Sequence, residues 1–286
     1  MDTLSQQLES LGVDILHQSD GTTAVIRLPG ILSDCHHFDP VANQFPSGLD
    51  IGVDSLTFEE ISNVIYLLRQ SGYHKVIPIG SSMGGMRLAF IIELLRQNHP
   101  EVMDDTDWLE LIIIDSPTGV ETMKDLPDAV ARLVPVKRIS LPICSIAMRL
   151  IVKPPRRDDI QVPGYELMRQ LAGVNMTDED WRIYVRVRSI LTAKEYTGRQ
   201  LQEWVDWMIQ VGRDGSLKRA ASSLRGIKST YICCNSKRLN TTVVQPRAAK
   251  WWESYANVTV TEIEAAHCGL LQMPETFNRA MQAVLA

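Results

Sequence analysis

The sequence lacks the features that usually indicate a nucleic-acid-binding or membrane protein. Its 29 basic side chains are outnumbered by 34 acidic ones, the formal net charge is −5, and no basic stripe interleaved with aromatic residues is present. No uninterrupted apolar run is long enough to span a bilayer. The first residues have neither the basic end nor the apolar stretch of a signal peptide. We therefore expect a cytoplasmic protein with no nucleic-acid partner and no membrane span.

Cysteine is also scarce. The chain has five cysteines, an odd number, and their spacing is not that of a metal site, so we expect reduced, buried thiols. The run Asp34-Cys35-His36-His37 holds several potential ligands. Neighbouring residues rarely converge on one ion, however, and no second ligand cluster with suitable spacing is present. The sequence thus predicts no metal site and no cofactor.

What the chain does contain is an alternation of strand-like and helical patterns. The helical spacing of residues 57–69 opens on Thr57 and Glu60, which resemble a capping box, and it ends before Gly72. The continuous apolar run at 109–114 is typical of a parallel strand covered on both faces. Strand alternating with helix indicates an α/β fold with a mostly parallel sheet. Strands are expected at residues 22–28, 48–54, 74–79, 109–114, 229–234 and 257–263, and further helices up to about 97, near 246–255 and from 274.

Two segments depart from this alternation. Residues 4–16 fit either a short helix or an irregular lead-in. Residues 120–222 contain no convincing strand, but they hold several apolar and amphipathic segments. A chain of 286 residues can form one large domain or a core with an insertion. We predict a core made of residues 1–119 and 223–286 and a mostly helical insertion at 120–222.

The pattern Gly80-x-Ser82-x-Gly84 lies between a strand-like run and a helical one. A serine hydroxyl is lifted clear of a sheet edge when the chain turns sharply from strand into helix, and glycines are needed where the backbone crowds that turn. A phosphate-binding loop would instead require Lys-Ser or Lys-Thr after the glycines, and Met86-Arg87 does not supply it. An ordinary strand-to-helix turn is the other alternative. We predict that Ser82 is a nucleophile.

Such a nucleophile needs a base, because a serine hydroxyl attacks poorly until its proton is removed. His267 follows the last expected strand by a few residues and precedes the final helix. In a parallel sheet this position lies at the carboxyl edge, where the turn at Ser82 also lies. The alternative is a loop histidine bonded to the backbone. We favour His267 as the base.

The strand–turn–helix pattern around Ser82 (a nucleophile elbow), the inserted helical segment at 120–222 and His267 near the end of the chain follow one another in the order typical of the α/β-hydrolase superfamily, which the sequence therefore resembles. The resemblance implies an eight-stranded, mostly parallel sheet with a cap inserted after the strand that ends at Ile114. It also implies an oxyanion hole made by two backbone amides. One would belong to Met83 and the other to Ile31, in Leu28-Pro29-Gly30-Ile31, where proline replaces the histidine of the family's usual His-Gly-x turn.

The acid of the triad is where the sequence departs from this pattern. Family members usually carry it a few residues after the strand that here ends at Cys234, but the only candidate there is Asn240, which is not a carboxylate. Some relatives place the acid at the end of the preceding strand, where this chain has Asp115. Many members, however, have an aspartate at this position whichever residue is the acid of their triad. We rank Asp115 ahead of Asn240 and Glu264.

Two functions follow from the resemblance. The first is a serine hydrolase that cleaves an ester or thioester of a hydrophobic small molecule through an acyl-enzyme, without a cofactor. The second is a catalytically weak or inactive protein that binds a hydrophobic small molecule in the same pocket. This alternative stays open because Asn240 stands where the family usually has its acid. Carbon–carbon bond hydrolases and acyltransferases share the scaffold, so the fold alone does not separate these reactions.

Overall fold

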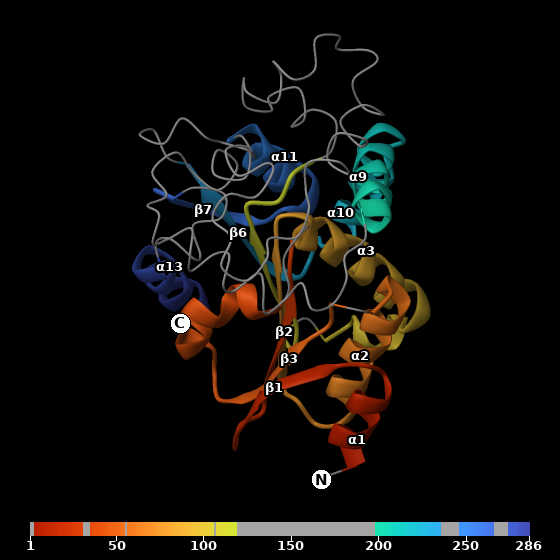
Figure 1. Cartoon of the computed structure of the whole chain (residues 1–286), viewed down its shortest axis with the longest axis vertical. Helices are drawn as coiled ribbons and strands as arrows, with labels where there is room; N and C mark the ends of the chain where they lie inside the picture. Colours follow the sequence, from red (N-terminus) through yellow and green to blue (C-terminus); the bar gives the residue numbers. More distant parts are fainter. Residues whose placement is uncertain are drawn as a thin grey trace.

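The computed structural model describes residues 3–30, 35–54, 56–105, 107–118, 198–235, 246–265 and 274–286. A seven-stranded sheet forms the centre of this part of the chain, in the order β1-β3-β2-β4-β5-β6-β7 (Figure 1). β1 runs antiparallel to β3, and all other neighbours are parallel, so the strands from β3 to β7 end at one common edge. The strands are β1 (Asp14–Gln18), β2 (Thr23–Leu28), β3 (Gly48–Gly52), β4 (Lys75–Ser81), β5 (Glu110–Ile114), β6 (Lys228–Cys234) and β7 (Thr259–Ile263).

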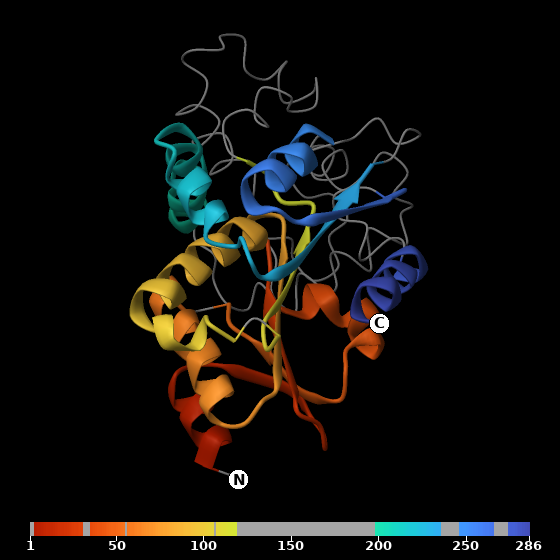
Figure 2. The ribbon, with the colours of Figure 1, turned by 180° about the vertical axis from the view of Figure 1, so that it is seen from behind.

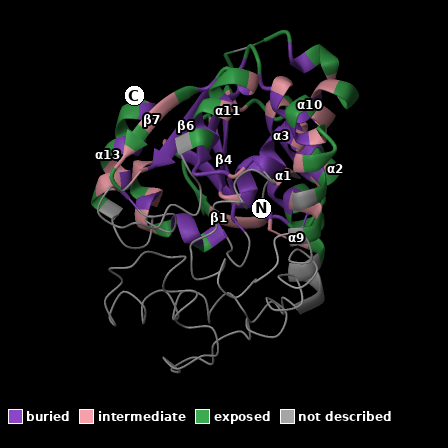
Figure 3. Ribbon diagram, turned by 90° about the horizontal axis from the view of Figure 1, so that it is seen from above, coloured by how far each residue is buried: buried purple, intermediate pink, exposed green. Residues whose placement is uncertain are grey.

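Helices cover both faces of the sheet. One hydrophobic cluster joins α1, α2, α3, α10 and α11 to the sheet, and a second joins η1 and α13 to the opposite face. Figure 2 shows the same arrangement from behind. Figure 3 shows that the central strands are buried, whereas the edge strands β1 and β7 and the outer sides of the helices hold intermediate and exposed residues. The helices are α1 (Thr3–Ser10), η1 (Cys35–Gln44), α2 (Phe58–Gln70), α3 (Met83–Asn98), η2 (Pro100–Val102), α9 (Gly198–Arg213), α10 (Ser216–Ser222), α11 (Pro246–Ala256) and α13 (Pro274–Leu285).

The start of α2 confirms a local expectation. The Thr57 side chain accepts a hydrogen bond from the Glu60 amide, and the Glu60 carboxylate accepts one from the Thr57 amide at 2.7 Å. The Glu60 carboxylate accepts hydrogen bonds from the amide and from the hydroxyl of Thr57, and these two bonds lower the pKa of Glu60 because they stabilise its ionised form. The capping box thus satisfies two amides that the first turn of a helix leaves without an intrahelical partner.

The amino-terminal segment contains a strand that the sequence pattern did not predict. Residues 4–16 were compatible with a helix or an irregular lead-in, and they contain the helix α1 followed by the first residues of β1. β1 is a half-exposed edge strand whose pairing with β3 is irregular between Ile15 and His17. An edge strand of this kind buries too little to show a clear apolar pattern. The sheet of the described residues has seven strands, whereas the family resemblance implied eight.

Two described helices lie in the predicted insertion at 120–222. α10 packs against the core helices α3 and α11, and α9 packs against α10. Trp207 of α9 packs against Phe58 of α2 edge to face and against Phe90 of α3 in a tilted arrangement, with ring centroids 5.4 and 5.5 Å away. The rest of the insertion lies outside the described residues, so its boundaries stay a prediction. Among the helices of the described ranges, none is both long and apolar enough to cross a membrane.

Candidate active site

The turn from β4 into α3 places Ser82 at the carboxyl edge of the sheet. Ser82 has φ 53° and ψ −122°, a conformation that costs free energy in any residue with a side chain. Its amide donates a hydrogen bond of 2.8 Å to the carbonyl of Ile114, which fixes the turn to the end of β5. Every other residue from 76 to 89 is buried, whereas Ser82 is partly exposed. The strained turn therefore presents one side chain to solvent.

Glycines make this turn sterically feasible. A Cβ atom at Gly84 would lie 2.1 Å from the carbonyl oxygen of Leu28, and one at Gly80 would lie 2.6 Å from the carbonyl carbon of Gly84. A Cβ atom at Gly30 would lie 2.9 Å from the Cβ atom of Ser82. Backbone crowding at Gly80 and Gly84 confirms the expectation from their spacing. The structure adds that the crowding at Gly84 comes from the end of β2.

This crowding leads to a stability prediction for Gly84→Ala. The added methyl group meets backbone rather than a movable side chain, so we expect the free energy of unfolding to fall by roughly 2–4 kcal/mol. Urea unfolding of the purified variant measures the change. Gly72→Ala is the control, since Gly72 has a φ of 91° but open space around it, and it should lose only about 1 kcal/mol. Equal losses in the two variants would contradict the packing argument.

The start of α3 adds backbone donors beside Ser82. α3 begins at Met83, which is buried, and the Ser82 side chain makes no capping hydrogen bond to the helix. The first amides of a helix have no intrahelical acceptor, and the helix dipole makes this end attractive to an anion. The amide of Met83, the first predicted oxyanion donor, lies in this first turn directly after Ser82. Ile31, the second predicted donor, lies outside the described residues, which end at Gly30 on this side.

Asp115 is at the same edge, one strand along. Ser81 pairs with Ile114 in the β4–β5 register, so Ser82 and Asp115 each follow that pair directly. Asp115 is 1% exposed and has φ 46°. Its amide donates to the carbonyl of Ile232 at 2.8 Å, and its carboxylate accepts a hydrogen bond from the Cys234 amide at 3.3 Å. These contacts hold the carboxyl group at the end of β6.

The neighbours of Asp115 are titratable groups on β6. Burial, followed by the charge of Asp115, raises the pKa of Tyr231 well above its ordinary value, and the Tyr231 hydroxyl donates to the carbonyl of Ser116 at 2.9 Å. Burial, then the charges of Asp115 and Glu262, raise the pKa of Cys233 from 9.0 to about 12. Both groups are therefore neutral at physiological pH, and the structure places them under the edge of the site as packed side chains.

The raised pKa of Cys233 predicts a loss of stability in alkali. Its thiol releases its proton at about 12 in the folded protein but near 9.0 in the unfolded chain. The unfolded state therefore binds fewer protons between these values, and the free energy of unfolding should fall by up to about 1.4 kcal/mol per pH unit. Urea unfolding from pH 8 to pH 11 measures the slope. The slope should be smaller in Cys233→Ala, and an unchanged slope would contradict the assignment.

The other predicted site residues divide into two groups. Asn240 and His267 lie outside the described residues. Glu264 is described, and it is an exposed residue directly after β7. The amide of Asn235 donates to the carbonyl of Ile263 at 2.9 Å, so the ends of β6 and β7 are adjacent at the edge that carries Asp115. The structure thus brings together Ser82, Met83 and Asp115, and the position of the base stays a prediction.

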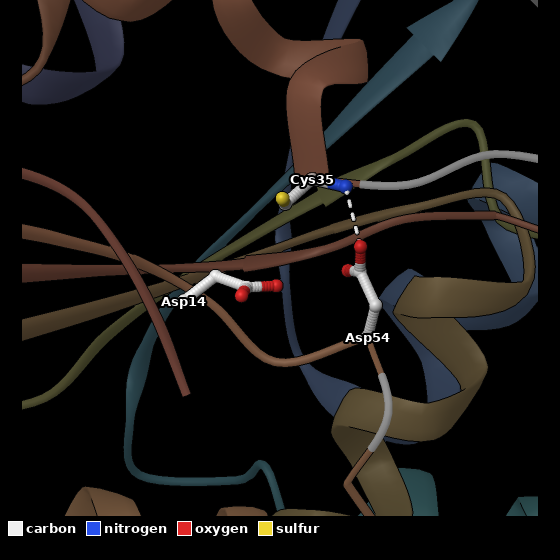
Figure 4. A group of neighbouring side chains, drawn as sticks. All are labelled: Asp14, Cys35 and Asp54. Atoms are coloured by element: carbon white, nitrogen blue, oxygen red, sulfur yellow. Dashed lines mark hydrogen bonds between the residues drawn. The ribbon is translucent and has the colours of Figure 1, made fainter. Parts of the chain in front are cut away.

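Cys35 has different neighbours from those its sequence suggests. Its Sγ atom lies with carboxylate oxygens of Asp14 and Asp54, all within 4.8 Å of one another (Figure 4). Nδ1 of the adjacent His36 instead lies 2.9 Å from Asp39. No sequence pattern indicated this group of three side chains, because they come from β1, η1 and the turn after β3, which are far apart in the chain. Asp34 lies outside the described residues, so the prediction for the run at 34–37 stays a prediction.

Comparisons with known proteins identify the fold and not a close relative. No family model matches the chain, and no curated protein matches its sequence. The structure is similar to a proline iminopeptidase-related protein from Thermus thermophilus, with a TM-score of 0.56 and 14% identity over 96% of this chain and 92% of that one. It is also similar to a thermophilic esterase, with a TM-score of 0.54 and 14% identity over 96% and 92% of the two chains.

A third structure is similar over almost its whole length. A lipase-esterase related protein from Clostridium acetobutylicum has a TM-score of 0.53 and 9% identity, over 95% of this chain and 98% of that one. Such low identities concern the fold, and they leave function to the residues of the site. The similarity extends over nearly the whole of each chain, so it concerns the complete fold. The chain has the α/β-hydrolase fold that its sequence predicted.

Proposed function

We propose that the protein is a serine hydrolase that cleaves an ester or thioester of a hydrophobic small molecule. The observation that carries this proposal is Ser82, a residue with a strained backbone and a partly exposed side chain in a buried turn, at the amino-terminal end of a helix. Strain of this kind persists only where the surrounding structure over-determines it, and it is concentrated at functional sites. The names of two of the similar structures, an esterase and a lipase-esterase related protein, support a reaction at an ester carbonyl.

The proposed reaction has two stages. The Ser82 hydroxyl attacks the carbonyl carbon while His267 takes its proton, and the amides of Met83 and Ile31 hold the negative oxygen of the tetrahedral intermediate. His267 then gives the proton to the leaving alcohol or thiol, which leaves an acyl group on Ser82. Water, activated by the same histidine, releases the acid. Asp115 orients the imidazole, and no cofactor takes part.

The predicted insertion at 120–222 provides substrate choice in this proposal. Small-molecule sites are mostly apolar and exclude water, and the apolar segments of the insertion would form such a cover above Ser82. The packing of α10 on α3 and α11 joins the end of the insertion to the helix that begins beside Ser82. A hydrophobic acyl or aromatic substrate is therefore the class we propose.

A fluorophosphonate probe tests the proposal directly. We expect the probe to label the native protein at neutral pH, and mass spectrometry of the digested protein should place the adduct on Ser82. Ser82→Ala should abolish labelling, whereas Ser81→Ala, which changes the buried neighbouring serine, should not. The absence of labelling, together with no turnover on a panel of acyl esters and thioesters of graded chain length, would instead favour a protein that only binds a hydrophobic small molecule.

A further inference from the structure

The segment that carries Asp115 is held by hydrogen bonds on both sides of this strained residue. The peptide group between Ile114 and Asp115 is the first of these points. Its carbonyl accepts a hydrogen bond from the Ser82 amide, and its N–H donates to the carbonyl of Ile232, both at 2.8 Å. One peptide group therefore joins the turn at Ser82 to β6, and Asp115 follows it with φ 46°.

Two buried aromatic side chains bind the chain on the other side of Asp115. The Tyr231 hydroxyl donates a hydrogen bond of 2.9 Å to the carbonyl oxygen of Ser116, and the indole N–H of Trp252 donates one of 3.1 Å to the same oxygen. Tyr231 belongs to β6 and Trp252 to α11, both residues are fully buried, and their rings stack with centroids 6.3 Å apart. A carbonyl oxygen has two lone pairs, so these donors use both.

The side chain of Ser116 is seated against the first turn of α3. A Cβ atom at Gly85 would lie 2.7 Å from the Cβ atom and 2.8 Å from the Oγ atom of Ser116, so Ser116 occupies the space that this glycine leaves. The Gly85 amide donates to the carbonyl of Ser82 at 3.1 Å. Ser116 therefore contacts β6 and α11 through its carbonyl, and the start of α3 through its side chain.

Their need for an acceptor does not by itself explain where Tyr231 and Trp252 bind. A buried tyrosine or tryptophan usually finds a partner for its polar group wherever it lies. Trp108 is the ordinary case, because it is 1% exposed, precedes β5 at the end opposite Asp115, and donates to the carbonyl of Val102 at 2.7 Å. Tyr231 and Trp252 instead converge on one carbonyl, directly after a residue whose strained backbone persists only where its surroundings over-determine it.

We propose that Tyr231 and Trp252 are positioning residues for the proposed hydrolysis, because together they hold the Asp115 carboxylate at the end of β6, where it would orient His267. The inference rests on the proposed function and on Asp115 as its acid. The hydrogen bond from the Cys234 amide to this carboxylate is 3.3 Å long, beyond the usual range of about 2.7–3.2 Å, so the backbone on both sides of Asp115 contributes to its place. A group misplaced by about 1 Å can lose about 100-fold in rate, so such a hold is relevant to catalysis.

Tyr231→Phe tests the proposal with the least disturbance, because it removes one donor and keeps the ring. We expect kcat on a p-nitrophenyl ester to fall about fivefold with KM within about twofold, since Asp115 is displaced while substrate contacts remain. Trp252→Phe should have an effect of similar size, and the double variant should lose about 30-fold. Trp108→Phe is the matched control, because it removes a buried indole with the same kind of hydrogen bond, and its kcat should stay within about twofold of the wild type.

The same substitutions made together with Asp115→Asn separate a positioning role from a merely structural one. If the aromatic pair acts through the carboxylate, Tyr231→Phe should cost less than about twofold in kcat once Asp115→Asn is present. A further loss as large as in the wild-type background would overturn the positioning role. So would a double variant with the kcat of Trp108→Phe, or an Asp115→Asn variant with undiminished kcat, while turnover that depends on Ser82 would leave the proposed function in place.

Hydrogen exchange tests the hold itself if the wild-type protein has no turnover and the proposed function fails. The Cys234 amide reports on the Asp115 carboxylate, and the Asn235 amide, which donates to Ile263, is the reference at the same strand end. Exchange at Cys234 about tenfold faster in the Tyr231→Phe/Trp252→Phe double variant, with exchange at Asn235 unchanged, would support the hold. Equal changes at the two amides, or no change at Cys234, would overturn it.

Discussion

Ser82→Ala is expected to lower kcat on an activated ester by at least about 10⁴-fold, with little change in the fold. Removing the nucleophile of a serine hydrolase leaves only the contribution of the oxyanion donors and of substrate binding. Alanine keeps the Cβ atom of serine and adds no atom to the crowded turn. Steady-state turnover of a p-nitrophenyl ester measures the effect, and circular dichroism confirms that the variant is folded.

The strain at position 82 supplies an independent control. A glycine adopts φ 53° and ψ −122° at far lower cost than a residue with a side chain. Ser82→Gly should therefore be more stable than Ser82→Ala by about 1–2 kcal/mol in urea unfolding, although both variants are inactive. Turnover close to that of the wild type in either variant would show that the reaction uses another nucleophile. An alanine variant as stable as the glycine variant would contradict the strain.

Local patterns were sufficient to predict most of the sheet. Five consecutive buried residues form β5, and a short apolar run of this kind is typical of a strand at the centre of a parallel sheet. The turn after β4 was predictable because two glycines and a serine have a fixed spacing there. β1 was not predictable, since an edge strand bonded on one side has little apolar surface to reveal it.

Contacts that depend on strand register were beyond the sequence pattern. Arg27 stands in a run that predicts a strand, but nothing local shows that it is buried or that Asp50, 23 positions away, binds it. The space for Cys35 exists because Gly52 lies opposite Arg27 in the β2–β3 register. Such a register is set by burial along whole strands, so its consequences appear only when the sheet is assembled.

The acid of the triad shows the same limit in the proposed site. Its position in the family pattern is measured from the end of a strand, and this chain has Asn240 after β6 and Asp115 after β5. The structure places Asp115 at the end of β6, through the hydrogen bond from the Cys234 amide. The carboxylate of Asp115, which directly follows β5, therefore lies at the end of β6, the strand after which the family usually carries its acid. This geometry supports Asp115 as the residue that orients His267.

Asp115→Asn should therefore lower kcat by roughly 10²- to 10⁴-fold, because an amide neither stabilises an imidazolium nor selects the correct tautomer of the base. Its oxygen can still accept the hydrogen bond from Cys234, so a similar melting temperature is expected, and turnover of a p-nitrophenyl ester isolates the loss of charge. Asn240→Asp and Glu264→Gln are the comparison variants. Activity that persists in Asp115→Asn and rises in Asn240→Asp would assign the acid to the segment after β6, and a loss confined to Glu264→Gln would assign it to the end of β7. A loss confined to Asp115→Asn would leave Asp115 as the residue whose charge supports the base.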